Sequence, residues 1–314
     1  MLTYLIILLD DTSTSYCHYE VTRTNQRLIG LDNLKAGILF AMKENLNVQF
    51  VYPSYVLPDD YNKVIESIDH IKIKPEGNAA FADVVVLKDW KKQEWDLFES
   101  TTYLIHCTRK DIVNERNTLK MLLEKVMRLD IVLTDVGSFS DADIAEYQET
   151  LNCLSDDIVE LYQKGEKVQL NLLTDRLILP SMNNCNAGDS NVTLAPNGRF
   201  YLCPAFYYED ENNDIGDITT ELKIRNPQLL RLDHAPLCRQ CDAFQCKRCI
   251  WQNEKLTLDI NTPSRQQCVM AHLERNASRK IVQQLAEKHI EIEGCQNIQE
   301  ICYLDPFEVY TRWK

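Results

Sequence analysis

The sequence predicts an α/β protein in which a parallel sheet with covering helices is followed by a small cysteine-rich domain. Strand-like and helix-like segments alternate in about six units up to roughly residue 175, a pattern typical of parallel strands joined by helices. After Pro180 the alternation gives way to turns rich in Asn, Gly, Asp and Cys. Seven cysteines then occur from Cys185 to Cys268. The sheet is expected to be either open or a partial (β/α) barrel.

The expected strands are short apolar runs. Leu2–Leu9 is apolar throughout, as is typical of a strand covered on both faces. Further strands are expected at Val48–Tyr52, Ala82–Leu87, Thr102–His106, Ile131–Leu133 and Val168–Leu173. These runs lie between the expected helices, so the order of elements is that of repeated strand–helix units.

The expected helices carry apolar side chains at helical spacing. Asp32 is expected to cap the first helix and Pro58 to open the second. A third is expected at Trp90–Glu99. The clearest helix follows Ser140, with acidic residues in its first turn and Gly165 just past its end. A last helix-like segment, before Gly294, carries Ile281, Leu285 and His289.

The chain is long for one ordinary domain, so we expect it to be divided. The change of composition near Pro180 predicts a first domain at residues 1–180. Residues 181–275 are expected to form the cysteine-rich domain, and residues 276–314 a helical C-terminal tail.

Composition and charge argue against several classes of function. Glycine is scarce, at 9 residues, and neither a G-x-G-x-x-G nor a Walker-type sequence occurs, which disfavours a nucleotide-phosphate enzyme. The net charge of −13 repels a nucleic-acid backbone. The apolar start ends at Asp10-Asp11, too short to span a bilayer, and lacks the leader of a signal peptide. We therefore expect a cytoplasmic protein that binds neither nucleic acid nor membrane.

Twelve cysteines in a cytoplasmic protein, where thiols stay reduced, favour metal binding over disulfides. The strongest local pattern is Cys238-x2-Cys241-x4-Cys246-x2-Cys249, in which each two-residue gap lets one turn present two sulfurs to a metal centre. A zinc ribbon usually separates its two pairs by about 15–20 residues. A single four-cysteine zinc site stays an alternative, but it leaves Cys185, Cys203 and Cys268 without a role. Two metal centres suit the spacing better.

The order of these cysteines, with Gly198-x4-Cys203 and Pro204, resembles the SPASM domain of radical SAM enzymes that modify ribosomal peptides. The segment Ile215-Gly216-Asp217-Ile218 is also similar, and the match covers roughly residues 183–275. The resemblance implies two auxiliary [4Fe–4S] clusters. For an outer cluster it implies the ligands Cys238, Cys241, Cys246 and Cys268, and for an inner cluster Cys185, Cys203 and Cys249.

Three thiolates leave the inner cluster one ligand short, because a four-iron cluster takes four ligands. The inner cluster then either recruits another group or presents an open iron that could bind a substrate thiolate or carboxylate. Cys295 and Cys302, in the C-terminal tail, are the alternatives for this eighth ligand.

The first domain lacks the radical-generating centre of those enzymes, which carry C-x3-C-x2-C directly after the first strand to hold a cluster that binds S-adenosylmethionine. Here Asp10, Thr14 and Cys17 occupy the three positions. The chain is therefore similar to the CXXX-repeat peptide maturase family, SPASM-bearing relatives of radical SAM enzymes without the signature cysteines. This resemblance implies a partial (β/α) barrel, no S-adenosylmethionine, and a ribosomally made substrate with cysteine at every fourth position.

We expect the chain to bind and mature such a peptide. The sequence leaves open whether it is itself an enzyme, an adaptor that delivers the precursor to a radical SAM partner, or a zinc-stabilised interaction module. Asp10, Cys17 and His18 are candidates for catalysis, since they would lie at the mouth of the barrel, where Cys17 and His18 would act as nucleophile and base. A capping loop rich in Ser and Thr is the alternative.

Overall fold

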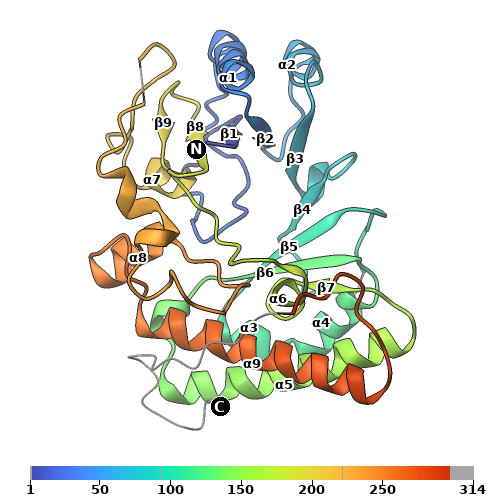
Figure 1. Cartoon of the computed structure of the whole chain (residues 1–314). Helices are drawn as coiled ribbons and strands as arrows, with labels where there is room; N and C mark the ends of the chain where they lie inside the picture. Colours follow the sequence, from blue (N-terminus) through green and yellow to red (C-terminus); the bar gives the residue numbers. More distant parts are fainter. Residues whose placement is uncertain (1, 93, 221, 298–314) are drawn as a thin grey trace. The chain divides into compact units, whose positions relative to one another are not determined.

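The computed structural model describes residues 2–92, 94–220 and 222–297, and the chain divides into two compact units (Figure 1). Unit 1 consists of Met1–Lys88 and Cys185–His234. Unit 2 consists of Asp89–Asn184 and Ala235–Lys314. Each unit therefore combines an early part of the chain with a later part. Of the cysteines that follow Pro180, Cys185 and Cys203 belong to unit 1, and those from Cys238 onward belong to unit 2.

Unit 1 contains strands in the order β4-β3-β2-β1-β8-β9. Their bounds are Tyr4–Leu8 for β1, Asn47–Val51 for β2, His70–Pro75 for β3, Val84–Leu87 for β4, Asn191–Leu194 for β8 and Phe200–Tyr201 for β9. Strand β1 is buried from its second residue onward and pairs in parallel with both β2 and β8. Strand β9 turns back and pairs antiparallel with β8.

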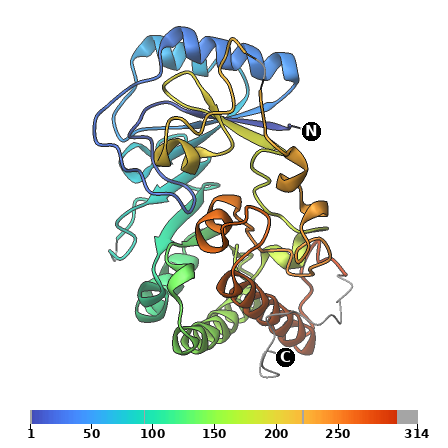
Figure 2. The same ribbon diagram turned by 90° about the vertical axis from the view of Figure 1, so that its left-hand side faces the viewer.

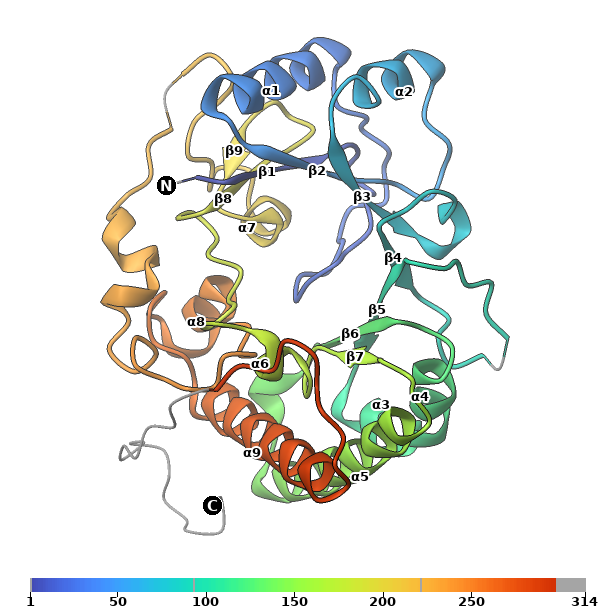
Figure 3. The same ribbon diagram turned by 45° about the vertical axis from the view of Figure 1, so that its right-hand side comes forward.

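The helices of unit 1 are α1 (Leu31–Glu44), α2 (Asp59–Ile65) and the short α7 (Pro204–Glu209). Helices α1 and α2 lie on one side of the strands and α7 on the other (Figure 3). Leu34 and Ile38 of α1 belong to the same buried core as Ile7 of β1 and Leu194 of β8. The apolar stripe of α1 thus holds the first and the later part of unit 1 together.

The described part of unit 2 has three parallel strands, β5 (Thr102–Cys107), β6 (Arg128–Leu133) and β7 (Gln169–Leu170). Its helices are α3 (Arg109–Asn114), α4 (Arg116–Leu123), α5 (Asp141–Gln163), α6 (Asp175–Ile178), α8 (Ile250–Thr257) and α9 (Arg265–Glu287). Helices α5 and α9 pack side by side (Figure 2). They run in the same direction, because Arg265 pairs with Asp141 at 3.1 Å and Lys280 with Asp156 at 3.0 Å. Within the described residues, no helix is long and apolar enough to cross a bilayer.

Several sequence expectations need correction. No helix forms in the described part of Trp90–Glu99: the Trp90 indole is buried and donates to the carbonyl of His106, and the Trp95 indole donates to the carbonyl of Trp90. Strand β3 was not expected, since its alternating Ile and Lys residues carry only a short signal. Gly30, not Asp32, is the N-cap of α1, and Asp32 lies in the first turn.

The segment after Pro180 also contains more regular secondary structure than the sequence indicated. It contributes β8 and β9 to unit 1, although the sequence indicated only turns there. Its last helix, α9, begins at Arg265, so Cys268 lies in the first turn of a long helix. The compact units do not coincide with residues 1–180, 181–275 and 276–314. The division of the chain into domains at these positions stays a prediction.

Both long helices of unit 2 begin with a capping box. The Ser140 hydroxyl accepts from the amide of Asp143, whose carboxylate accepts from the amide of Ser140. Ser264 and Gln267 make the same exchange at the start of α9. These reciprocal hydrogen bonds satisfy amide groups that the first helical turn leaves without partners.

We expect Ser140→Ala to lower the free energy of unfolding by about 1 kcal/mol, because the cap of α5 is lost. Urea unfolding followed by circular dichroism measures this. Ser54→Ala is the matched control, since Ser54 is exposed and lies outside the helices. Equal losses in both variants would show that the cap contributes nothing specific.

Candidate functional site

The loop that follows β1, residues 10–28, begins with two buried carboxylates. Asp10 accepts from the amide and hydroxyl of Thr12 at 2.8 and 2.6 Å, and its other oxygen accepts from the Tyr55 hydroxyl at 2.8 Å. The Asp10 amide donates to the Ser13 hydroxyl at 3.0 Å. Every one of these partners belongs to unit 1, so Asp10 is held inside a local hydrogen-bond network.

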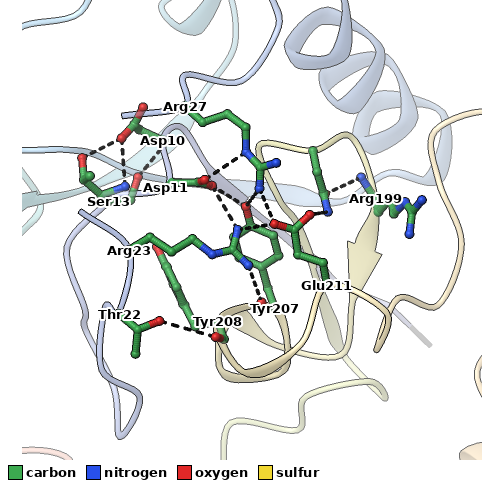
Figure 4. A network of polar contacts seen from close by, with 12 residues as sticks. Asp10, Asp11, Ser13, Thr22, Arg23, Arg27, Arg199, Tyr207, Tyr208 and Glu211 are labelled. Atoms are coloured by element: carbon green, nitrogen blue, oxygen red, sulfur yellow. Dashed lines mark hydrogen bonds and ion pairs between the residues drawn. The ribbon is translucent and has the colours of Figure 1, made fainter. Parts of the chain in front are cut away.

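Asp11 links this loop to α7 (Figure 4). Its carboxylate pairs with Arg27 Nε at 2.9 Å and Arg23 Nη1 at 3.4 Å, and accepts a hydrogen bond from the Tyr207 hydroxyl. The same two guanidinium groups reach Glu211, at 2.6 and 2.9 Å. We call Asp11, Arg23, Arg27, Tyr207 and Glu211 the arginine network. Its two carboxylates and two guanidinium groups balance in charge, which offsets the desolvation of the buried Asp11.

The arginine network shifts the pKa values of Tyr207 and Glu211. Burial and the Asp11 carboxylate raise the pKa of Tyr207 far above its ordinary value. Burial raises the pKa of Glu211, but hydrogen bonds from Arg27 and Asn197 outweigh it and leave that pKa below its ordinary value. Near neutral pH the network therefore holds a neutral phenol between two carboxylates and two cations.

Aromatic rings continue the contact between the loop and α7. Tyr16 packs edge-on against Tyr19, with ring centroids 5.8 Å apart, and Tyr19 stacks on Tyr208 at 5.4 Å. The Arg23 guanidinium lies 3.9 Å from the centroid of the Tyr207 ring. Residues 16–23 are thus laid along the side chains of α7.

Three cysteines of unit 1 lie near these rings. Cys203 directly precedes α7, and the pKa of its thiol is raised by burial and then by Cys185 and Cys17. Burial raises the pKa of Tyr16 too, followed by Cys17, Cys203 and Cys185. Cys17, Cys185 and Cys203, which we call the unit 1 thiols, are therefore coupled electrostatically through Cys203 and Tyr16.

Four cysteines of unit 2 form a second group, the unit 2 thiols: Cys238, Cys241, Cys246 and Cys268. The pKa of Cys246 is raised by burial and then by Cys238, Cys241, Cys268 and Glu274. Burial raises the pKa of Cys238 to about 11, while Arg248 opposes the rise. The Cys241 sulfur accepts from the Ala243 amide at 3.4 Å and lies 3.7 Å from His272 Nε2.

Helix α9 supplies much of this second group. Cys268, His272 and Glu274 lie on its first turns, and Glu274 accepts from the Tyr147 hydroxyl of α5 at 2.7 Å. Burial raises the pKa of Glu274 to about 7, against hydrogen bonds from Tyr147 and Gln245. The packing of α9 on α5 therefore fixes the side of the group that carries Cys268.

The donor set fits a metal centre in kind. All seven positions are cysteine, the residue that holds zinc and iron–sulfur clusters, and the described cysteines form no disulfide. Among the described residues, no three His, Cys, Asp or Glu side chains form a group that could hold a single metal ion. Cys203 and Cys246 are nevertheless each coupled electrostatically to other thiols of their own unit. The Ala243 amide also donates to the Cys241 sulfur, and hydrogen bonds of this kind tune the reduction potential of an iron–sulfur cluster.

The remaining sequence candidates are distributed through both units. Cys249 is buried in unit 2, directly before α8. His18 is half-buried in the loop after β1, beside Cys17 in the sequence. Cys295 is exposed in unit 2, and Cys302 lies outside the described residues.

Sequence reasoning did not find the arginine network. Its members come from the loop after β1 and from the chain around α7, nearly 200 positions later, as the 196-residue separation of Asp11 and Tyr207 shows. The only signal was the aromatic run that includes Tyr207 and Tyr208, followed by acidic residues. That run lies in helix α7.

We expect Asp11→Ala to lower the free energy of unfolding by about 2 kcal/mol, since it leaves the Tyr207 hydroxyl and Arg27 without their shared acceptor. Chemical unfolding checks this. Glu20→Ala, an exposed carboxylate of the same loop, should change stability by less than about 0.5 kcal/mol. A network without energetic weight would make the two variants alike.

Comparison with known proteins gives the fold but no family. No protein-family model matches the sequence, and no curated protein matches it. A structure of polyhistidine-tagged anSMEcpe with bound AdoMet has a TM-score of 0.58 and 14% identity, over 90% of this chain and 98% of that one. Native anSMEcpe with bound AdoMet and Kp18Cys peptide has a TM-score of 0.61 and 14% identity, over 91% and 99%. The complex with Cp18Cys peptide has a TM-score of 0.61 and 13% identity, over 92% and 100%. The chain therefore shares the mostly parallel α/β fold of anSMEcpe along nearly its whole length.

Proposed function

We propose that this chain binds and matures a ribosomally made, cysteine-repeat peptide, and that a SPASM-like region carries two auxiliary [4Fe–4S] clusters. One observation carries the proposal. The pKa of the Cys246 thiol is raised by burial and then by Cys238, Cys241 and Cys268, and these four residues are the ligand set that the resemblance implies for the outer cluster. Three of them come from irregular chain before α8, and Cys268 comes from the first turn of α9.

The fold adds support for a peptide substrate. The similar structures of anSMEcpe hold AdoMet, and two of them hold an added peptide, Kp18Cys or Cp18Cys. By this likeness we extend peptide binding to the present chain. That the peptide has cysteine at every fourth position rests on the CXXX-repeat resemblance alone.

The clusters would supply electron transfer when bound. The chain's own residues would hold them: Cys238, Cys241, Cys246 and Cys268 for the outer cluster, and Cys185, Cys203 and Cys249 among the ligands of the inner one. The Ala243 amide would stabilise the Cys241 thiolate, and Arg248 favours that of Cys238. The buried Glu274 stays near its midpoint of protonation at neutral pH, next to the outer ligands.

The adaptor alternative is favoured by a specific observation in the loop after β1. Two of the positions that would bear signature cysteines, Asp10 and Thr14, are buried, and Asp10 is engaged with Tyr55 and Thr12. In this second candidate function the chain binds the precursor and a radical SAM partner performs the chemistry. A catalytic role for Cys17 with His18 stays the weakest of the proposals.

Metal content after anaerobic purification tests the cluster assignment. We expect about eight irons and as much sulfide per chain. Cys246→Ser should lower both by about four, whereas Cys153→Ser, a half-buried cysteine of α5, should leave both unchanged. About one or two zinc ions without iron would instead establish the zinc-stabilised module, and about twelve irons a third cluster.

Mass spectrometry of a CXXX-repeat peptide separates the maturase from the adaptor. A maturase changes the mass of the peptide when the purified chain is supplied alone with a reductant. An adaptor binds the peptide, which fluorescence anisotropy of a labelled peptide measures, but leaves its mass unchanged until a partner enzyme is added. A chain that neither binds nor alters the peptide would contradict both.

S-adenosylmethionine binding needs its own measurement. The similar structure of anSMEcpe holds AdoMet, so the comparison does not support the expectation that the present chain binds none. Because Asp10, Thr14 and Cys17 occupy the three positions of the signature cysteines, we expect isothermal titration calorimetry with millimolar S-adenosylmethionine to show no binding. anSMEcpe serves as the positive control. Micromolar binding to the present chain would refute this expectation without affecting the peptide assignment.

A further inference from the structure

A buried aspartate lies in the middle of the cysteine segment of unit 2. Asp242 directly follows Cys241 in the sequence and is only 2% exposed. The inference drawn from it rests on the proposed function, because it concerns the metal centre that the unit 2 thiols would hold. It does not depend on whether that centre is an iron–sulfur cluster or zinc.

Two guanidinium groups hold Asp242 from two helices. Arg275 of α9 donates from Nη1 to Asp242 Oδ1 at 2.9 Å, and Arg176 Nη2 of α6 lies 3.7 Å from Oδ2. Arg176 also donates from Nε to the main-chain carbonyl of Asp242 at 3.0 Å. Both the side chain and the backbone of Asp242 are therefore fixed, and all three residues belong to unit 2. A buried carboxylate without such cations would carry a large desolvation penalty, so the arrangement is strongly preferred.

The chain around Asp242 folds into two short turns. The Cys241 amide donates to the carbonyl of Cys238 at 3.0 Å, and the Cys246 amide donates to that of Ala243 at 3.0 Å. The Ala243 amide, directly after Asp242, donates to the Cys241 sulfur at 3.4 Å. Asp242 is thus the residue between this sulfur and the amide that donates to it. Fixing Asp242 therefore fixes how the first turn presents Cys241.

Other residues of the segment fasten it to unit 2 further along the chain. The carbonyl of Phe244 accepts from the Asn183 amide at 2.8 Å, and Gln245 Nε2 donates to the carbonyl of Ala271 at 2.7 Å. These two contacts hold the second turn, whereas the ion pairs of Asp242 hold the first.

A turn that the protein holds in place favours metal binding. Ordering mobile chain around a metal costs conformational entropy, and a turn that is already ordered avoids this cost. Groups that hold metal ligands in place contribute about 10–100-fold to metal affinity. The charge of Asp242 has the opposite effect, because a carboxylate next to a thiol disfavours the thiolate. Positioning and charge therefore differ in the sign of their effect on metal binding.

We propose that Asp242 is a positioning residue for the metal centre of unit 2. Its pairing with Arg275 and Arg176 holds the turn that presents Cys238 and Cys241 to the metal. Asp242 acts through this turn and is not itself a ligand.

Asp242→Asn tests this role, because it removes the charge on which the ion pairs depend and nearly preserves the shape of the side chain. The metal-loaded chain is treated with EDTA and iodoacetamide under anaerobic conditions, and peptide mass mapping follows the rate at which Cys241 is alkylated. We expect this rate to be about 10–100-fold higher than in the wild-type chain. A wild-type rate, or the lower rate that the loss of charge alone would give, would overturn the proposal.

Asp157→Asn is the matched control. Asp157 is also buried in unit 2 and pairs with two cations, Arg116 at 3.3 Å and Lys120 at 2.9 Å, but it lies on α5, outside the cysteine segment. The control should lower stability to urea to a comparable degree and leave the alkylation rate of Cys241 unchanged. Equal acceleration in both variants would reduce Asp242 to a general contribution to stability and overturn the proposal.

Removing a partner of the carboxylate keeps the test valid if Asp242→Asn does not fold. Arg275→Gln leaves Asp242 its contacts with Arg176 and should also accelerate the alkylation of Cys241. Arg116→Gln, which removes a partner of the control carboxylate, should not. A wild-type rate in Arg275→Gln would overturn the proposal.

Failure of this role and failure of the proposed function give different results. A wild-type chain with zinc and no iron would refute the clusters, and the same alkylation rates would then decide the role of Asp242 toward zinc. A wild-type chain in which EDTA does not change the alkylation of Cys241 would hold no metal at this centre, which would overturn both proposals together.

Discussion

The salt bridges of Asp11 are the contacts on which the arrangement of unit 1 depends. A carboxylate at the end of the central strand β1 holds Arg23 and Arg27, which also bind Glu211 and so tie the loop after β1 to the chain around α7. A buried carboxylate without these cations would carry a large desolvation penalty. The same pairing that offsets the desolvation of Asp11 therefore fastens the loop that carries Cys17 to the helix that follows Cys203.

In unit 2, the packing of two helices positions the chain around Cys268. Helices α5 and α9 each begin with a capping box and lie side by side, and the Tyr147–Glu274 hydrogen bond joins them within the core. Cys268 and His272 are carried on α9, whereas Cys238, Cys241 and Cys246 come from irregular chain before α8. A helix thus carries the cysteine most distant in sequence, and irregular chain carries the three closely spaced ones.

Local patterns predicted much of the fold, because their causes are local. The apolar run of β1 and the cap at Ser140 with the apolar stripe of α5 act within a few residues. Strands β8 and β9 could not be found in this way, since they are short and are stabilised by pairing with β1 and by the core around Phe200. The cysteine spacing grouped Cys238, Cys241 and Cys246 with Cys249, and only the resemblance named Cys268 beside them. Nothing in the spacing associates the loop after β1 with the chain around α7, an association that depends on the ion pairs of Arg23 and Arg27.

The hydrogen bonds of Asp10 give the start of the loop after β1 a structural role. Both oxygens of its carboxylate already accept within unit 1, one from Thr12 and the other from Tyr55. A ligand bound at this position would have to replace these buried hydrogen bonds, and leaving their donors without acceptors costs about 1–3 kcal/mol for each. The loop is therefore built first of all as a folded connection between β1 and the chain around α7, which is the physical reason why delivery of a peptide to a partner stays a candidate function beside its maturation.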